Sequence, residues 1–399
     1  MALPSSCDVL IVGAGPAGTA AATVLARAGV RVVLADQRTF PRDKVCGDGL
    51  ISDALASLRT LGIHDRVAAQ AAFASDLRIY PPWGRFVSLR GAFACVPRER
   101  LDAMLLEAAA TAGATCVSGA AAAGALDEDG LVKGAWFNVS GQRTAVRAAV
   151  TLLATGANAV ALKAFGLDSA LQPTAVAGRA YYTAPPDVAA EFTSLIIGYD
   201  RRWCPGYGWV FPSPGNRFNI GVGLFTESAG ARRLREFWTR FTSTFAPAAA
   251  IIRASIEAGA FRGAPLRSAL TGGAFGRPGL LTVGEAASLT YAATGEGIGK
   301  AMESGMLAAR CAQDFLGGRR PLRTLHHEYE REFRARFETR YRAYTAAQRW
   351  AANPIVLSLL TARTNAGTFA RQELEDLIGE RGSARRLFSK IGLLKAVVR

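Results

Sequence analysis

Residues 13–18, Gly-Ala-Gly-Pro-Ala-Gly, have the residue types and spacing of a loop that binds a diphosphate group. The first glycine of such a loop allows a tight turn, the second lets the backbone approach the pyrophosphate, and the third lets a helix pack closely on a strand. The N–H groups that begin the helix attract phosphate oxygens. Asp36 follows 18 residues after Gly18, where a carboxylate accepts hydrogen bonds from an adenosine ribose. These features predict a dinucleotide site formed by Gly13, Gly15, Pro16, Ala17, Gly18, Asp36 and the adjacent Gln37.

The elements that must hold this loop are a strand, a helix and a second strand. Apolar runs at residues 7–12 and 30–35 predict two buried strands, and residues 16–28 predict the helix between them. The motif by itself does not separate NAD from FAD. Its position favours FAD, because a site that opens at residue 8, with the rest of the chain returning to it, is the usual layout of FAD enzymes.

The whole pattern predicts an α/β fold: a Rossmann-type FAD-binding domain interleaved with a β-sheet substrate domain, followed by a helical C-terminal region. The further elements that we predict are a strand–turn–strand at 76–96, a helix at 97–112, a meander at 116–150, a strand at 150–154, strands with one helix near 230–246 within 170–262, a strand at 279–283, a helix at 297–315 and helices from 325 onward. The predicted FAD-binding domain comprises residues 1–75, 97–165 and 263–320, the substrate domain 76–96 and 166–262, and the C-terminal region 321–399.

Composition and charge exclude several classes of function. The 399 residues include 47 Lys and Arg against 32 Asp and Glu, a net charge of +15. No nucleic-acid-binding module accompanies this charge, so an anionic membrane surface or an anionic protein is the better expectation. Six scattered cysteines and three histidines lack metal-ligand spacing, so we predict no metal site and a reducing, cytoplasmic location. Glycines interrupt the one long apolar run, so we expect no membrane-spanning helix.

Four further segments carry a resemblance to a known family. They are 40–50 (FPRDKVCGDGL), 97–102 (PRERLD), 207–223 (YGWVFP, eight residues, GVG) and 283–305 with VGEAA, TGEGI and MESG. In these segments the chain resembles the geranylgeranyl reductase family, within the larger group of flavoproteins shaped like para-hydroxybenzoate hydroxylase. The resemblance runs from about residue 7 to about residue 380 and implies FAD as the cofactor.

The resemblance also implies residues beside the FAD: Lys44, Cys46, Gly47, Arg98, Gly156, Glu285, Gly295, Gly297 and Ile298. Arg98 is expected to reach the FAD phosphates or ribose. The turn at 294–297 is expected to begin a helix aimed at the flavin, whose N-terminus stabilises negative charge on reduced flavin. Asp48 replaces a glycine of the family pattern. Glu285 replaces an aspartate that contacts the ribityl chain in the family, so that contact must adjust to a longer side chain.

An aromatic row predicts the substrate site. Tyr207, Trp209 and Phe211 alternate along one strand, so their side chains share a face. Together with Gly221 and Gly223 they match the substrate-binding signature of the family, although Cys204 stands where that pattern has proline. No obvious general acid emerges, and the candidates for a catalytic role are Cys46 and Tyr207.

The leading interpretation is an FAD-dependent reductase that transfers hydride from flavin N5 to a C=C bond of an apolar or isoprenoid substrate. NADPH, NADH and reduced ferredoxin remain open as electron donors. One alternative is a flavin monooxygenase, a hydroxylase or less favourably a halogenase, acting on an aromatic or a peptide- or carrier-borne substrate in a biosynthetic pathway. A flavin-binding accessory protein is an alternative of another class.

The arginine-rich C-terminal part has two open interpretations. Its apolar stretch at 354–360 and the amphipathic, cationic stretch at 387–395 suit peripheral contact with an anionic membrane or a protein. The same part suits a helical lid that packs on the protein and leaves its arginines in water.

Overall fold

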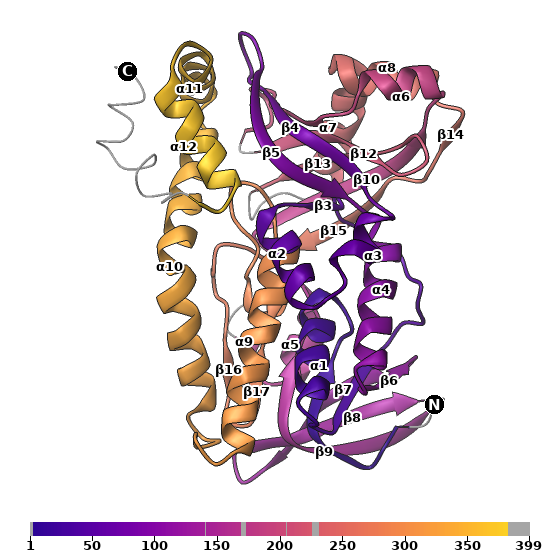
Figure 1. The fold of residues 1–399 in the computed structure, drawn as a ribbon, viewed down its shortest axis with the longest axis vertical. Coiled ribbons are helices and arrows are strands. Elements are labelled where there is room, and N and C mark those ends of the chain that lie inside the picture. Colours follow the sequence, from indigo (N-terminus) through magenta and orange to yellow (C-terminus); the bar gives the residue numbers. More distant parts are fainter. Residues whose placement is uncertain (1–2, 140, 169–172, 205, 226–230, 382–399) are drawn as a thin grey trace.

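The computed structural model describes residues 3–139, 141–168, 173–204, 206–225 and 231–381. Figure 1 shows two β-sheet regions at opposite ends of an elongated molecule, with long helices along one side. The N-terminal strands lie in the lower region, and the C-terminal helices rise along the side to the upper one. This is the mixed α/β architecture with a helical C-terminal region that the sequence predicts. The division into domains by residue number stays a prediction.

The first sheet contains the predicted βαβ unit. Its strands run in the order β16 (Gly276–Arg277), β17 (Leu280–Thr282), β9 (Gln142–Leu153), β1 (Ser6–Val12), β2 (Val32–Asp36) and β6 (Thr115–Ser118). β1 pairs in parallel with β2 and β9, which places Val9 beside Val32 and Val150. Other elements of the chain cover both faces of this sheet, so its strands are apolar on both sides.

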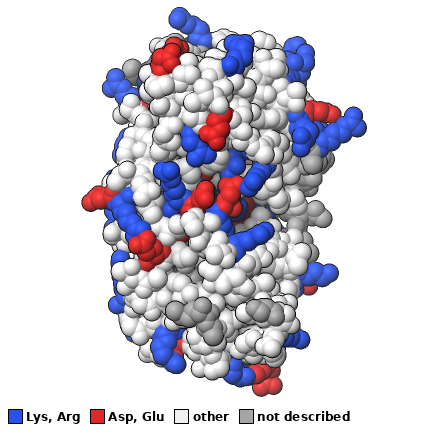
Figure 2. Space-filling view, turned by 90° about the vertical axis from the view of Figure 1, so that its right-hand side faces the viewer, with Lys and Arg blue, Asp and Glu red and all other residues white. Residues whose placement is uncertain are grey.

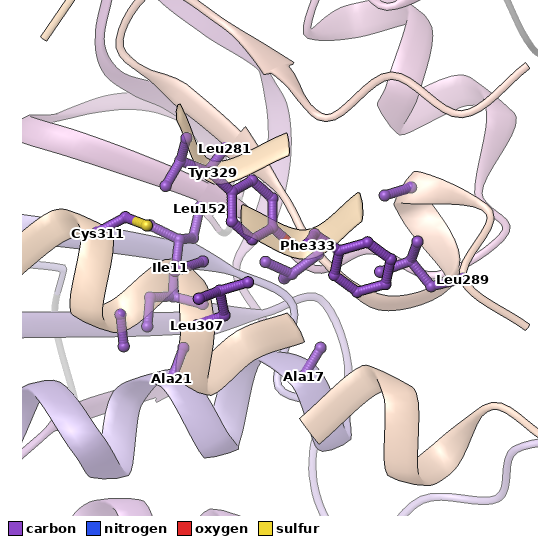
Figure 3. Packing of buried hydrophobic residues seen from close by; sticks show 14 of the residues in the cluster. Ile11, Ala17, Ala21, Leu152, Leu281, Leu289, Leu307, Cys311, Tyr329 and Phe333 are labelled. Carbon is purple, nitrogen blue, oxygen red and sulfur yellow. The ribbon is translucent and has the colours of Figure 1, made fainter. Parts of the chain in front are cut away.

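The two faces of this sheet are covered differently. The helices α1 (Pro16–Arg27), α4 (Arg98–Thr111) and α9 (Ile298–Leu316) are on one face, while β7 (Ala121–Glu128), β8 (Leu131–Val139) and α5 (Ala159–Ala164) are on the other. Side chains of β1 alternate accordingly: Ile11 packs toward the helices and Leu10 toward the meander. Figure 3 shows Ile11 and Leu152 packed with Leu307 and Cys311 of α9, and with Tyr329 of the next helix. The predicted meander turns at Asp129 and Gly130, which both have positive φ.

The second sheet contains most of the remaining strands. Their order is β14 (Glu257–Ala258), β10 (Ala175–Thr183), β13 (Arg217–Leu224), β12 (Gly206–Ser213), β11 (Leu195–Gly198), β4 (Ala72–Tyr80), β5 (Val87–Cys95) and β3 (Gly49–Leu50), with β15 (Arg262–Leu266) also on β10. The predicted helix near 230–246 is α7 (Ala231–Thr244). Two further helices, α6 (Pro186–Glu191) and α8 (Ala246–Ala254), were not predicted. Both carry a proline in their first turn, where it starts a helix although it usually signals a break.

The remaining short elements lie between two strands of the second sheet or follow the last strand of the first. They are α2 (Ser52–Thr60), α3 (His64–Ala68) and the 3₁₀ turn η2 (Gly284–Ala287).

Figure 2 shows one broad face of the molecule, on which side chains of both charges mix near the middle and large areas are uncharged. Among the described residues drawn on this face, basic side chains alternate with acidic and uncharged ones.

Three C-terminal helices form a lid over the cavity described below. α10 (Leu325–Ala351) packs against α9, and α11 (Pro354–Ala366) and α12 (Thr368–Ile378) pack against β5 (Figure 1). An ion-pair network fastens the end of α12: Glu380 pairs with Arg340 of α10 and with the buried Lys300 of α9. Lys300 also lies 3.3 Å from Asp53 of α2. The lid interpretation therefore describes residues 325–380, whereas the stretch at 387–395 lies outside the described residues.

Across the described ranges, no helix combines the length and the apolar character needed to cross a membrane.

Candidate active site

A cavity of about 670 Å³ connects the glycine loop with the C-terminal helices. The first part is lined by the loop of residues 13–17, the segment 42–49 and the turn 293–298. The second part is lined by β4, β5 and β11 on one side and by α10, α11 and α12 on the other. The aromatic row of β12 lies where the two parts meet: the Tyr207 hydroxyl bonds the turn, and Phe211 packs on the same apolar cluster as Ile378, the last residue of α12.

The three glycines of the loop have different surroundings, which fit three different roles. A β-carbon at Gly13 would overlap the carbonyl oxygen of Ala154, and one at Gly18 would overlap the carbonyl oxygen of Gly13. A β-carbon at Gly15 would meet nothing closer than the Arg42 side chain at 3.9 Å. Gly13 and Gly18 are therefore required by the packing of the chain itself. Gly15 instead faces open space, where the predicted pyrophosphate would lie.

Asp36 organises this loop from the end of β2. One carboxylate oxygen accepts a hydrogen bond from the backbone N–H of Ala14 at 2.8 Å, and the other accepts one from the backbone N–H of Arg38 at 2.8 Å. Asp36 therefore fixes the turn of the glycine loop. It also lines the cavity, as does Gln37, but its predicted contact with an adenosine ribose remains a prediction.

The residues present fit FAD, as two features that the chain itself leaves unfilled indicate. The N-terminal N–H groups of α1 and α9 both open on the cavity, at Gly15 and Gly297. Thr155 lines the cavity with a buried hydroxyl that has no hydrogen-bond partner in the described part of the chain. Such groups suit a ligand with phosphate, hydroxyl and carbonyl oxygens. The Lys44 ammonium lies 3.6 Å from a carboxylate oxygen of Glu285, and this ion pair forms part of the cavity wall.

Asp48, at the position where the family pattern has glycine, anchors the loop that carries Cys46. Its buried carboxylate accepts hydrogen bonds from the Tyr181 hydroxyl, from the Asn219 side chain at 2.7 Å and from the Arg98 N–H at 3.3 Å. Burial raises the pKa of Asp48 to about 6, an effect that the hydrogen bonds from Tyr181 and Asn219 oppose. Asp48 adopts a left-handed φ of 65°, which costs a non-glycine residue some strain. The three hydrogen-bond donors around the carboxylate explain why an aspartate is tolerated at this position.

The aromatic row lies on one face, as predicted. Tyr207, Trp209 and Phe211 all line the cavity, with successive ring centroids 6.3 and 6.4 Å apart. Trp209 donates a hydrogen bond to Asn219 at 2.8 Å, and a β-carbon at Gly221 would overlap its ring. Gly221 therefore makes room for the tryptophan from behind.

The structure brings nearly all the predicted site residues to one cavity. Its lining includes Gly13, Gly15, Pro16, Ala17, Asp36, Gln37, Lys44, Cys46, Gly47, Arg98, Gly156, Glu285, Gly295, Gly297, Ile298, Tyr207, Trp209, Phe211 and Gly223. Gly18 and Gly221 lie behind the wall, where they allow close packing. Arg98 is held by two hydrogen bonds to Asp102, at 2.7 and 2.8 Å, so its guanidinium is fixed at the edge of the site. The roles of all these residues stay predictions.

The two predicted catalytic candidates differ in their surroundings. The Tyr207 hydroxyl donates to the carbonyl of Thr294, and burial raises the pKa of Tyr207 well above its ordinary value. Its proton is therefore held by the turn that begins α9. Cys46 lies half-buried on the cavity wall, with its sulfur accepting the N–H of Asp48 at 3.4 Å. The Arg98 side chain also forms a hydrogen bond with Cys46.

Sequence reasoning missed Glu296, which lies between Gly295 and Gly297 in the turn that begins α9. Its half-buried side chain lines the cavity. Burial, and to a smaller extent the nearby Asp53, raises the pKa of this carboxyl from its usual 4.5 to about 8. A neutral carboxylic acid can therefore face the cavity at neutral pH. Only the fold could reveal this, because nothing in the sequence shows that this turn is buried beside Asp53 of α2.

The raised pKa of Glu296 gives a testable dependence of stability on pH. The folded protein keeps a proton on Glu296 between pH 4.5 and about 8, whereas the unfolded chain releases it near pH 4.5. The stabilisation is therefore complete below pH 4.5 and is lost as the pH rises through 8. We expect the Tm of the wild type to fall across this window by several degrees more than that of Glu296→Gln, which cannot titrate. Parallel Tm curves for both proteins would contradict this assignment.

The second part of the cavity is almost wholly apolar. From the sheet it is lined by Leu77, Ile79, Val87, Leu89, Phe93, Leu195 and Ile197, and from the lid by Ala347, Trp350, Ala351, Leu357, Leu360, Leu374, Leu377 and Ile378. No Asp, Glu, Lys or Arg side chain lines this part within the described ranges. It therefore suits a flexible hydrocarbon chain.

Comparison with known proteins agrees with this geometry. The family described as FAD binding domain matches residues 6–343. A digeranylgeranylglycerophospholipid reductase of Methanosarcina mazei is 31% identical over 342 residues, which cover 82% of this chain and 80% of that protein. A menaquinone reductase of Mycolicibacterium smegmatis is 32% identical over 319 residues, covering 76% and 75%. The crystal structure of a geranylgeranyl bacteriochlorophyll reductase-like protein from Thermoplasma acidophilum has the same fold, with a TM-score of 0.77, 24% identity and coverage of 99% and 96%.

Proposed function

The chain belongs to the FAD binding domain family, and on that premise we propose that this FAD-dependent oxidoreductase is a reductase that saturates C=C bonds in the isoprenoid chains of a lipid. The observation that carries the proposal is the apolar second part of the cavity, which continues from the predicted flavin site between the second sheet and the lid. The relative from Methanosarcina mazei, whose name states that it reduces a geranylgeranyl lipid, supports the same substrate class.

Each part of the cavity has a different task in this proposal. The chemistry that FAD supplies when bound and reduced is hydride delivery from N5 to one carbon of the double bond. The glycine loop, Lys44, Arg98 and Glu285 hold the cofactor, and the N-terminus of α9 stabilises negative charge on it. Tyr207, Trp209 and Phe211 position the chain against it, while the lid helices exclude water.

A proton must reach the second carbon of the double bond to complete the reduction. Glu296 and Cys46 both line the cavity, whereas the Tyr207 hydroxyl is bonded to a carbonyl. We propose Glu296 as the first candidate for the proton donor, since its raised pKa keeps it protonated near pH 7. Cys46 is the second candidate.

The experiment that tests the function is a single turnover without oxygen. The FAD-loaded protein is reduced with dithionite, mixed with a geranylgeranyl lipid under nitrogen, and followed by flavin absorbance and by the mass of the lipid. We expect flavin reoxidation together with a gain of two hydrogens for each double bond. NADPH, NADH and reduced ferredoxin are then compared as donors.

Two results would overturn the proposal. Turnover that requires oxygen and consumes it in step with substrate would identify a monooxygenase. Tight FAD binding with no reoxidation by any lipid would favour the accessory-protein alternative.

A further inference from the structure

One end of the molecule exposes large apolar side chains at the far end of the cavity. Trp83 and Phe86, at the tip of the β4–β5 hairpin, are 47% and 40% exposed, and Ile355 and Leu359 of α11 are 70% and 44% exposed. We call these four side chains the apolar end face. Figure 1 shows the hairpin tip and α11 together at the upper end of the molecule.

The hairpin and α11 are joined by hydrogen bonds. The N–H of Trp83 donates to the Ser358 hydroxyl at 3.3 Å, and the side chain of Asn365 donates to the carbonyl of Phe86 at 3.0 Å. The four exposed side chains therefore belong to one surface, made from segments that are far apart in the sequence.

α11 is apolar on both sides, although only one side is covered. Leu357, Leu360, Thr361 and Thr364 line the cavity, and their spacing places them on one face of the helix. Ile355 and Leu359 lie on the opposite face, together with the exposed Ala362 and Ala366. A helix of a globular protein usually has one apolar face, which is directed to the core. The outer face of α11 therefore suits an apolar phase outside the protein, one helix away from the cavity.

The charge around this face is positive. The sequence has no Asp or Glu from residue 339 to 372, or from 77 to 98. The exposed arginines Arg85, Arg349 and Arg363 flank the face, and none forms an ion pair within the described part of the chain. Aromatic and aliphatic side chains ringed by cations are typical of surfaces that lie in the interface of an anionic bilayer.

We propose that the apolar end face docks on an anionic lipid bilayer, so that a lipid chain passes between α11 and the β4–β5 hairpin into the cavity. The proposal rests on the proposed function for its substrate, but the docking can be measured without turnover. A lipid surface is favoured over a protein partner because the apolar cavity begins directly behind this face. Val87, which lines the cavity, directly follows the exposed Phe86 in the chain.

The test compares binding of the full chain to two kinds of vesicle in a cosedimentation assay. One is phosphatidylcholine alone, and the other contains equal parts of phosphatidylcholine and phosphatidylglycerol. We expect the wild type to bind the anionic vesicles and to bind the neutral ones at least about tenfold more weakly. The double variant Ile355→Glu/Leu359→Glu should bind anionic vesicles at least about tenfold more weakly than the wild type.

The matched control is Ile256→Glu, which places a glutamate at an exposed isoleucine outside this face. Ile256 is 74% exposed and precedes β14. This variant should bind like the wild type, and all variants should keep their FAD and their Tm.

Several outcomes would overturn the proposal: no binding of the wild type to anionic vesicles, unchanged binding by the double variant, or equal loss with Ile256→Glu. A chain ending at residue 381 separates the C-terminal stretch from the end face. If that deletion alone abolishes binding while the double variant binds normally, the C-terminal stretch is the docking segment and the end face is not. Failure of the single turnover with intact vesicle binding would instead contradict only the proposed function.

Discussion

Replacing Gly15 with valine should abolish FAD binding and leave the protein folded. Gly15 has φ −78° and ψ −175°, which valine readily adopts, and a β-carbon there meets nothing closer than 3.9 Å. The added side chain would fill the space predicted for the pyrophosphate. We expect the Kd for FAD to rise by more than about a hundredfold, each factor of ten corresponding to about 1.4 kcal/mol. Flavin fluorescence titration of the apoprotein measures the loss, and circular dichroism reports the fold.

Gly18→Val is the matched control, because it adds the same side chain to another glycine of the same loop, but at a position inside the packed interior. Its β-carbon would overlap the carbonyl oxygen of Gly13, so the strand and helix would have to separate. We expect this variant to lose folded protein as well as FAD. If Gly15→Val binds FAD normally, or if it unfolds as Gly18→Val does, the assignment of the pyrophosphate site is wrong.

Replacing Ala347 with tryptophan should shorten the cavity and select against long substrates. Ala347 of α10 lines the apolar part, one helical turn beyond Tyr344. The indole should fill space that a long isoprenoid chain needs. We expect kcat/KM for a geranylgeranyl lipid to fall by about tenfold or more, and that for an analogue with one short prenyl unit to change little. FAD affinity should be unaffected, because the substitution lies on the lid.

The control is Ala335→Trp, at an exposed position of α10 that does not line the cavity. It adds the same bulk to the lid without narrowing the cavity, so both substrates should be turned over as by the wild type. Equal losses for long and short substrates in Ala347→Trp, or no loss with either, would show that the substrate does not occupy the space between the lid and the sheet.

Local sequence patterns predicted much of the fold and of the site. The glycine loop, its flanking strands and helix, and the turn before α9 depend on short-range chemistry, and they occur within two residues of the predicted positions. The aromatic row was predictable because side chains alternate along any strand. The family resemblance added what spacing alone could not, namely that these separate segments belong to one site.

The parts that sequence could not predict depend on contacts between distant segments. The apolar residues of α11 are compatible with a membrane anchor, a lid or a core helix, and only the packing against β5 places Leu357 and Leu360 on the cavity. Glu296 looks like a polar turn residue until its buried surroundings are known. Asp48 looked like a simple departure from a glycine pattern, but three donors around its carboxylate define its role.

The cofactor site draws on strands from both halves of the chain, and this has a consequence for biosynthesis. β1 carries the glycine loop, but its neighbour β9 ends at Leu153, and β9 in turn pairs with β17, which begins at Leu280. Most of the chain must therefore leave the ribosome before Glu285 and the N-terminus of α9 can complete the site. Such long-range pairing is slow and leaves apolar strands uncovered in the growing chain. We therefore expect FAD binding to be a late step of assembly, in which free FAD stabilises the completed fold by mass action.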